Sequence, residues 1–162
     1  MVKKRLLALG AALLLMGMTV AVNAQVRIAV LPFQNLHGLV DYNELCYTLA
    51  DSLAKALQQE QNHHFVVIHP DTVDLAVLEV NLNPDNPQFL SDRWIVAAKL
   101  GADKVITGTL NVRYGKVFVN VYVYDMKTKK AEFQLRNLYR SQKQYLALVG
   151  RIVPKLVKYF NQ

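Results

Sequence analysis

The sequence predicts an α/β (α+β) fold, with a mixed sheet of about five strands and helices packed mainly on one face of that sheet. Two patterns predict it. Some segments carry apolar residues at the spacing of an amphipathic helix, and others are continuously apolar or alternate as half-buried strands do. In chain order these segments read β-α-β-α-α-β-β-β-α, with no internal repeat.

The first predicted strand is the nearly continuous apolar run VRIAVLPF at 26–33, as expected for a strand buried on both faces. A loop follows over 34–43. From about 42 to 61, leucines recur every fourth residue, which predicts an amphipathic helix. Asp41 or Asn43 can cap the start of that helix.

A second short strand is expected at 65–68, followed by a helix that Asp71 or Thr72 can cap. A loop rich in turn-forming residues comes next. The third helix then begins at Asn86 or at Ser91.

Two glycines lie around the end of this third helix. Gly101 follows its last turn and is expected to end it in a left-handed conformation, whereas Gly108 falls inside the next strand. A phosphate-binding loop needs the opposite order, in which a strand leads through a glycine loop into a helix N-terminus. The order of elements therefore argues against a nucleotide site.

Three strands follow at 104–113, 116–125 and 131–140, joined by short turns into a meander. The last helix comes after them. Ser141 can cap this helix, and Pro154 is expected to kink it.

Residues 1–24 have the pattern of a cleaved signal peptide: basic residues at 3–5, an apolar stretch, and small residues ending at Ala24. We therefore expect export to the periplasm, cleavage after Ala24, and one domain over 25–162 with no integral membrane segment. Retention of the uncleaved segment as an anchor is the alternative.

The chain carries 19 Lys and Arg against 12 Asp and Glu, a formal net charge of +7. The predicted signal contains three of the basic residues, which leaves a net charge of +4 for the rest. This excess is smaller than nucleic-acid binding requires, so no nucleic-acid partner is expected. The single cysteine cannot form an internal disulfide.

No catalytic, cofactor-binding or metal-ligating residues are predicted. His63 and His64 are adjacent, so on an extended chain they point to opposite faces. Cys46 lies beside the apolar stripe of the first helix, where a buried core role is expected. The carboxylates lie near helix starts and turns, where capping explains them.

The middle strand of the meander is the candidate interaction site. Its valines are expected to face the helices, so Phe118, Asn120, Tyr122 and Tyr124 occupy the other face, with Arg136 beside them on the last strand. Tyrosine provides a large, rigid contact area with a polar tip, and is enriched at interfaces. A partner-binding surface and a plain exposed sheet are both consistent with this pattern.

The last helix offers a second surface. Arg151, Lys155 and Lys158 lie at helical spacing opposite the apolar stripe, with Lys143 one turn earlier. This basic line is either a solvated face or a contact with anionic lipid or polymer.

Several stretches carry a family resemblance: VRIAVLPFQN, LADSLAKAL, FVVIHPDTVD and AAKLGADKVITGTLNVRYGKVFVNVYVYD. Together they resemble the N-terminal domain of TolB, over nearly all of residues 26–160. The module is also similar to parts of FlgT, FlgO, CsgG and PelC, and of the lipoprotein activators of penicillin-binding proteins. The resemblance implies a periplasmic interaction or assembly module with no catalytic residues to transfer.

We therefore expect a non-enzymatic periplasmic module that binds other envelope proteins. It would act in an outer-membrane or peptidoglycan-associated complex, or as a homo-oligomer. Motility, curli, polysaccharide export, cell-wall synthesis and the Tol system are all open as its pathway. A small-molecule or glycan-binding domain and an unrecognised hydrolase are the alternatives.

Overall fold

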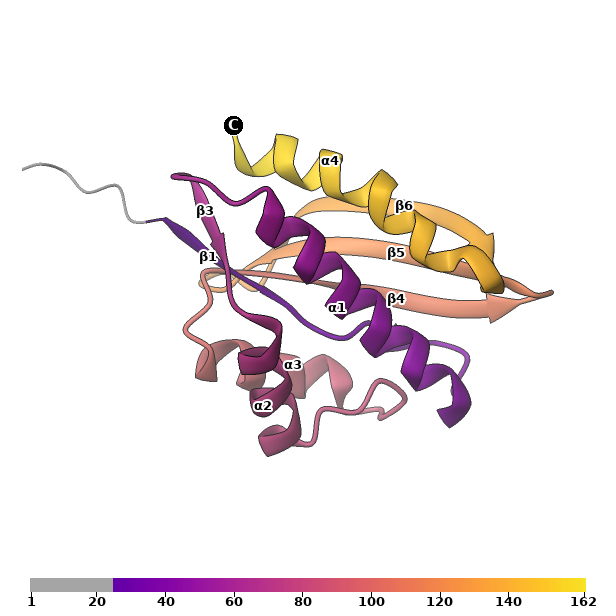
Figure 1. The fold of residues 1–162 in the computed structure, drawn as a ribbon. Coiled ribbons are helices and arrows are strands. Elements are labelled where there is room, and N and C mark those ends of the chain that lie inside the picture. Colours follow the sequence, from indigo (N-terminus) through magenta and orange to yellow (C-terminus); the bar gives the residue numbers. More distant parts are fainter. Residues whose placement is uncertain (1–24) are drawn as a thin grey trace, which may run out of the picture.

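The computed structural model describes residues 25–162 and shows a twisted mixed sheet with helices on both sides (Figure 1). The predicted signal peptide lies outside the described residues. None of the helices described within residues 25–162 has both the length and the hydropathy of a membrane-spanning segment. The strands are β1 (Val26–Val30), β2 (Gln34–Asn35), β3 (Phe65–Val67), β4 (Lys104–Arg113), β5 (Lys116–Asp125) and β6 (Ala131–Ser141), and the helices are α1 (Asn43–Gln59), α2 (Pro70–Val80), α3 (Phe89–Lys99) and α4 (Val149–Phe160).

The sheet has the strand order β3-β1-β4-β5-β6, and β2 pairs separately with β4. β1 runs parallel to β3 and β4, whereas β4, β5 and β6 form an antiparallel meander. The predicted mixed α+β fold is confirmed. The first strand ends at Val30, earlier than predicted, and pairing resumes with β2 after Pro32, which has no N–H to donate.

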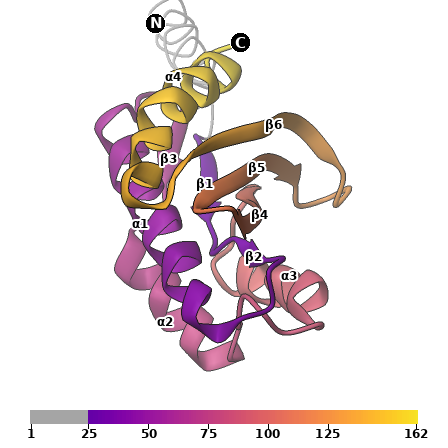
Figure 2. The same cartoon turned by 90° about the vertical axis from the view of Figure 1, so that its right-hand side faces the viewer.

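Helices cover both faces of the sheet, so the prediction that they pack mainly on one face was wrong (Figure 2). β1 provides the physical reason, because its side chains alternate between two apolar clusters. Ile28 and Val30 belong to the cluster under α1 and α4, and Ala29 belongs to the cluster under α2 and α3. A central strand that is apolar on both faces needs a helical layer on each.

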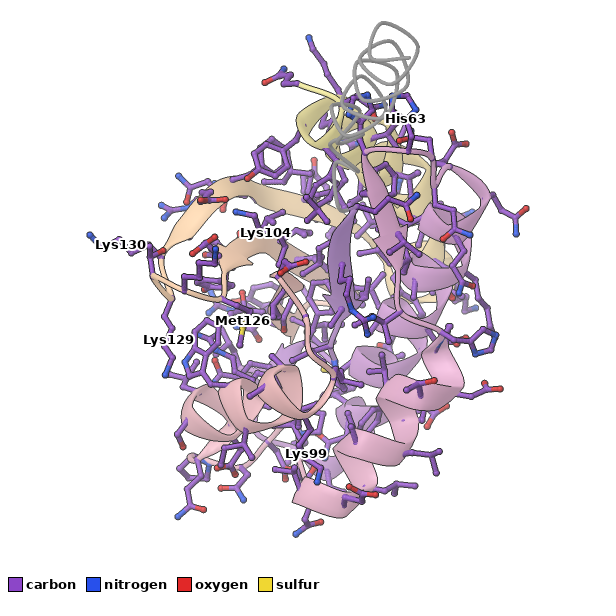
Figure 3. All side chains as sticks on the ribbon, turned by 90° about the vertical axis from the view of Figure 1, so that its left-hand side faces the viewer. His63, Lys99, Lys104, Met126, Lys129 and Lys130 are labelled. Carbon is purple, nitrogen blue, oxygen red and sulfur yellow. The ribbon has the colours of Figure 1, made fainter. Side chains whose placement is uncertain are left out.

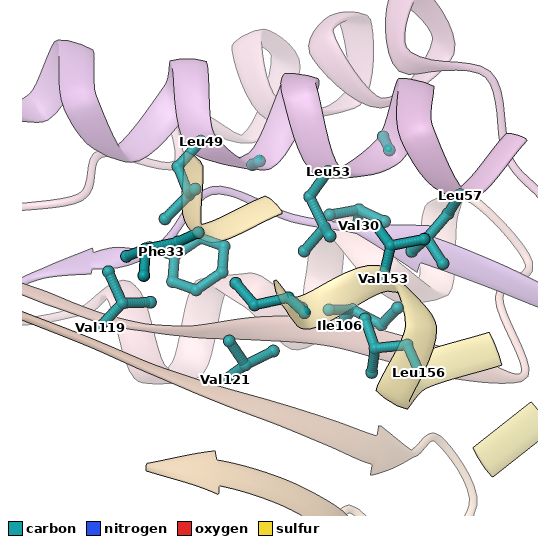
Figure 4. Packing of buried hydrophobic residues seen from close by; sticks show 14 of the residues in the cluster. Val30, Phe33, Leu49, Leu53, Leu57, Ile106, Val119, Val121, Val153 and Leu156 are labelled. Atoms are coloured by element: carbon teal, nitrogen blue, oxygen red, sulfur yellow. The ribbon is translucent and has the colours of Figure 1, made fainter. Parts of the chain in front are cut away.

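The larger core lies between the sheet, α1 and α4 (Figure 4). Leu49, Leu53 and Leu57 of α1 are fully buried there, as are Val121 of β5 and Leu156 of α4. The predicted leucine stripe and the inward-facing valines of the middle strand are therefore confirmed.

The meander has almost the predicted strand bounds, with β6 one residue longer. Tyr114 and Gly115 connect β4 to β5 with φ values of 51° and 69°, the left-handed pair that a tight hairpin favours. The pairing of β5 with β6 shifts register twice, around Asn120 and just before Tyr124. Each shift inserts an unpaired residue on β6 and changes the orientation of its neighbours.

The first two helices are capped differently from the prediction, although α1 begins at Asn43, close to the predicted start. Tyr42 precedes α1 without a side-chain cap, and neither Asp41 nor Asn43 fills that role. The cap of α2 is His69, whose imidazole Nδ1 accepts a hydrogen bond of 3.3 Å from the backbone N–H of Asp71. This places the helix start at Pro70, whose fixed φ suits a first helical position.

The later helix starts also differ. α3 begins at Phe89, between the two predicted starts. Ser141 does not cap α4, because a 3₁₀ helix, Gln142–Leu148, separates them. The apolar stripe across both segments is nevertheless confirmed, since Tyr145 and Ile152 are both buried against the core.

Both glycine predictions are confirmed. Gly101 follows α3 with φ +59°, and Gly108 lies inside β4. A Cβ at Gly108 would overlap the carbonyl oxygen of Asn120 on β5 and lie 2.8 Å from Cε1 of Phe33. Gly108 is therefore explained by close packing of the backbone and not by a ligand.

Candidate interaction surface on the open half of the sheet

One half of the sheet is left open on the side of α2 and α3. These helices cover β1 and the beginning of β4, and β4, β5 and β6 extend well beyond them (Figure 1). Among the described residues, the apolar cluster under α2 and α3 reaches β5 only at Tyr124, with Met126 in the turn after that strand. The remaining part of this sheet face, and the loop beside it, is called the open face below.

The open face contains a depression of about 220 Å³. Its residues come from all three meander strands and from the loop after β2. The depression is lined by Leu36, Thr109, Asn111, Arg113, Phe118, Asn120 and Asn137. Lys116, Tyr122, Arg136 and Tyr139 complete the open face around it.

Asn120 joins the three strands at the centre of this surface. Its amide Nδ2 donates to Thr109 Oγ1 on β4 at 3.0 Å, and its Oδ1 accepts from the backbone N–H of Asn137 on β6 at 2.9 Å. Asn137 has φ 57°, in the bulge that accommodates the register shift. The depression is therefore held rigidly by the sheet, and Arg136 is exposed beside Asn137 in that bulge.

The predicted aromatic residues divide into two groups. Phe118 stacks on Tyr139 with a centroid separation of 5.7 Å, and Tyr122 lies 5.9 Å from Tyr124. Tyr124 in turn packs edge-on against Trp94 of α3 at 5.4 Å. Phe118, Asn120 and Tyr122 are thus on the open face, whereas Tyr124 lies at its border under α3.

Sequence reasoning missed Leu36 and Tyr139, which are both half exposed on this surface. Tyr139 follows the bulge, so its facing could not be read from the alternation of β6. Leu36 is presented by a buried amide network: Asn35 Nδ2 donates to Leu39 O and to Asn43 Oδ1, each at 2.8 Å. Asn43 continues the network to Asn83 Oδ1 at 2.9 Å, which ties this loop to the loop after α2.

The predicted basic line on the last helix is incomplete. Arg151, Lys155 and Lys158 are exposed on α4, but Lys143 lies in the preceding 3₁₀ helix and borders a different depression. Lys155 and Lys158 border a groove of about 300 Å³ between α4 and β6, whose floor includes Phe133. The four cations are therefore not one line along a single helix.

Sequence reasoning also missed an ion network around Lys104, which is labelled in Figure 3. Lys104 Nζ lies 2.9 Å from Asp125 Oδ2 and 2.5 Å from Glu132 Oε2, and the hydroxyl of Tyr159 donates to Glu132 at 2.8 Å. Hydrogen bonding from Lys104, and then from the backbone of Thr128, holds the pKa of Asp125 below its usual range. These interactions join β4, β5, β6 and α4, so their role is structural.

Cys46 occupies the buried core position that was predicted for it. Cys46 is fully buried, and this burial, with a smaller contribution from Asp85, raises the pKa of its thiol to about 12. A nucleophilic cysteine requires the opposite shift. The rings of His63 and His64 are 4.0 Å apart, yet within residues 25–162 no group of three or more His, Cys, Asp and Glu could hold a metal.

A family model described as FlgO protein matches residues 10–131, most of the chain. No curated protein sequence matches it. Among solved structures, the chain is similar to lipoprotein GNA1162 from Neisseria meningitidis, with TM-score 0.53 and 16% identity over 84% of this chain and 98% of that one. It is also similar to the LpoB C-terminal domain from Escherichia coli, with TM-score 0.51 and 15% identity over 75% and 87% of the two chains. At these identities the structures show a shared fold only.

Proposed function

This chain belongs to the FlgO protein family, and we propose that it is a non-enzymatic interaction module of the bacterial cell envelope that binds partner proteins through the open face. The proposal includes export to the periplasm with cleavage after Ala24, leaving the single domain 25–162. The observation that carries it is a rigid, aromatic and amide-rich surface that no described helix covers.

The composition of this surface supports protein binding. Phe118 and Tyr139 provide paired rings, and Asn111, Asn120 and Asn137 supply amide groups around them. Aromatic anchors surrounded by polar groups are typical of protein interfaces. The sheet holds these groups in place before a partner arrives, which lowers the ordering cost of binding.

Lipoprotein GNA1162 and the LpoB domain have the same fold, and the first is named as a lipoprotein. This likeness supports a location in the envelope. Envelope proteins are therefore the expected partners, within an outer-membrane or peptidoglycan-associated complex. The proposal also includes a homo-oligomer, in which two copies of this chain would associate through the open face.

Site-specific photocrosslinking in cells that express the whole chain tests this proposal. We expect a photoreactive phenylalanine analogue at Tyr122 to yield a discrete crosslinked partner. The same analogue at Leu78, which is 75% exposed on α2, is the matched control and should not yield this product. Crosslinks from Leu78 alone, or an unchanged partner with the folded variant Phe118→Ser, would contradict the proposal.

Glycan binding is the second candidate, because aromatic rings beside amide groups also suit sugars. Chitooligosaccharide added to the purified protein would then raise its melting temperature, since a ligand of the native state stabilises it by mass action. A hydrolase is the third alternative from the sequence. Burial of Cys46, the one thiol, raises its pKa to about 12 and argues against a cysteine nucleophile.

A further inference from the structure

The charges on the open face have a single sign. Arg113 and Lys116 lie opposite each other at the hairpin end, and Arg136 lies in the bulge of β6. Arg93 of α3 adds a cation at the border near Tyr124. None of the residues that line the depression or complete the open face is an Asp or Glu.

These cations do not stabilise the fold through ion pairs. Within residues 25–162, carboxylates pair with Lys55, Lys99 and Lys104, and none lies within 4.0 Å of Arg113, Lys116, Arg136 or Arg93. Arg113 and Lys116, which lie opposite each other, repel, and an anionic partner would relieve that repulsion.

Two of the cations are also held in place by aromatic rings. The guanidinium carbon of Arg93 lies 4.5 Å from the ring centroid of Trp94 and 4.6 Å from that of Tyr124. Its Nε is buried without a hydrogen-bond partner among the described residues. Lys116 Nζ lies 5.5 Å from the ring centroid of Tyr139. Such contacts orient a cation without neutralising it.

We infer that the open face binds an acidic protein segment, whose Asp and Glu side chains pair with Arg113, Lys116 and Arg136 while its apolar side chains pack on Phe118 and Tyr139. This inference rests on the proposed function and names the chemistry of the partner. Arginine provides two parallel donors to a carboxylate, so the three cations around one depression favour carboxylates in register. Charge complementarity of this kind chiefly sets specificity and association rate.

A titration of the isotope-labelled protein, purified from the envelope of cells that express the whole chain, tests the inference. The probe is a hexaglutamate peptide, and hexaglutamine is its uncharged control. We expect amide shifts on β4, β5 and β6 with hexaglutamate only, and weaker binding as salt rises from about 0.05 to about 0.3 M. Equal shifts with hexaglutamine, or shifts centred on α4, would overturn the inference.

Charge variants make the test specific to this surface. We expect Arg113→Gln with Arg136→Gln to weaken hexaglutamate binding by about tenfold, because charge-assisted hydrogen bonds are lost. Arg151→Gln with Lys155→Gln removes the same charge from α4 and should change binding less than about twofold. If the first variant misfolds, Lys116→Gln alone should still weaken binding, since its side chain is exposed at the turn.

The result separates this inference from the proposed function. If the Arg113 and Arg136 variant binds hexaglutamate as the wild type does, while photocrosslinking at Tyr122 still captures a partner, only the acidic-segment inference fails. If crosslinking at Tyr122 also fails, the proposed function fails. Polygalacturonate is the competing anionic glycan, and stronger binding of that polymer than of hexaglutamate would overturn the assignment to an acidic protein.

Discussion

The variant Gly108→Ala tests whether the packing of β4 against β5 requires a residue without a side chain at position 108. The added Cβ would overlap the carbonyl oxygen of Asn120, and would lie 2.9 Å from the carbonyl carbon and 2.8 Å from Cε1 of Phe33. Carbon atoms in contact lie about 3.5 to 4.0 Å apart, and the overlap with the oxygen is deeper still, so β5 would have to move by more than about 1 Å. Phe33 is fully buried and cannot retreat freely.

Overpacked core positions cost about 1 to 3 kcal/mol, and this one should reach about 3 kcal/mol or more because backbone has to move. For a domain of this size, that loss lowers the melting temperature by about 10 °C. The measurement is thermal unfolding followed by circular dichroism. A fall of less than about 2 °C would refute the reasoning, because it would show that the strands separate at almost no cost.

Gly150→Ala is the matched control. Gly150 lies in α4, and a Cβ there would meet no atom within 4 Å. Alanine favours a helix over glycine by up to about 1 kcal/mol, so this variant should keep or raise the melting temperature.

Asn120 is the central residue of the open face and also the residue that Gly108 contacts. Gly108→Ala should therefore also disturb the amide signals of the open face, whereas Gly150→Ala should leave them unchanged.

Two further predictions concern buried and paired groups. Hydrogen bonds from Lys104 lower the pKa of both Asp125 and Glu132, so the stabilisation they provide is present above the ordinary carboxyl range near pH 4 and is lost as pH falls below it. In urea titrations, the free energy of unfolding of Asp125→Asn should therefore fall less steeply between about pH 5 and pH 3 than that of the wild type. Parallel slopes for the two proteins would contradict this. Cys46 should react with a maleimide only after denaturation, because burial removes its thiol from solvent and raises its pKa to about 12. The variant Cys46→Ser serves as the blank. Rapid labelling of the native protein would show that α1 is not packed as described.

The fold could be predicted from the sequence where residues close together in the chain determine the local structure by themselves. The three strands of the meander follow from alternation and from the Tyr114-Gly115 turn, and the α1 stripe follows from leucines at every fourth position. Gly101 was correctly identified as a helix end because few residues other than glycine adopt its left-handed conformation easily. These features depend on residues close together in the chain.

The helix caps were not predictable from the same kind of rule. Asn43 looks like a cap because asparagine favours helix starts, yet its amide donates to Asn83 and Asp85 across the structure. His69 is rarely considered as a cap, but its imidazole Nδ1 is an acceptor placed just before Pro70. Where a polar side chain has both a local and a distant partner, the sequence shows only the local one.

The open face was predictable in part, since Phe118, Asn120 and Tyr122 lie where alternation along β5 places them. The edge of the open face on β6 could not be predicted, because strict alternation of side chains along a strand does not account for the bulges in β6. The bulge before Tyr124 lets Glu132 reach Lys104 and Tyr159, whereas strict alternation along β6 would place it on the face of Tyr122.

That displacement has a functional consequence, because it removes a carboxylate from the border of the open face. Had β6 kept strict alternation, Glu132 would have shared the face of Tyr122 and added a negative charge there. The bulge instead directs this carboxylate into the Lys104 network, where it is already paired. Arg113, Lys116 and Arg136 have no carboxylate within 4.0 Å among the described residues. The bulge adds no negative charge at the border of the same face, and together these features favour an acidic ligand.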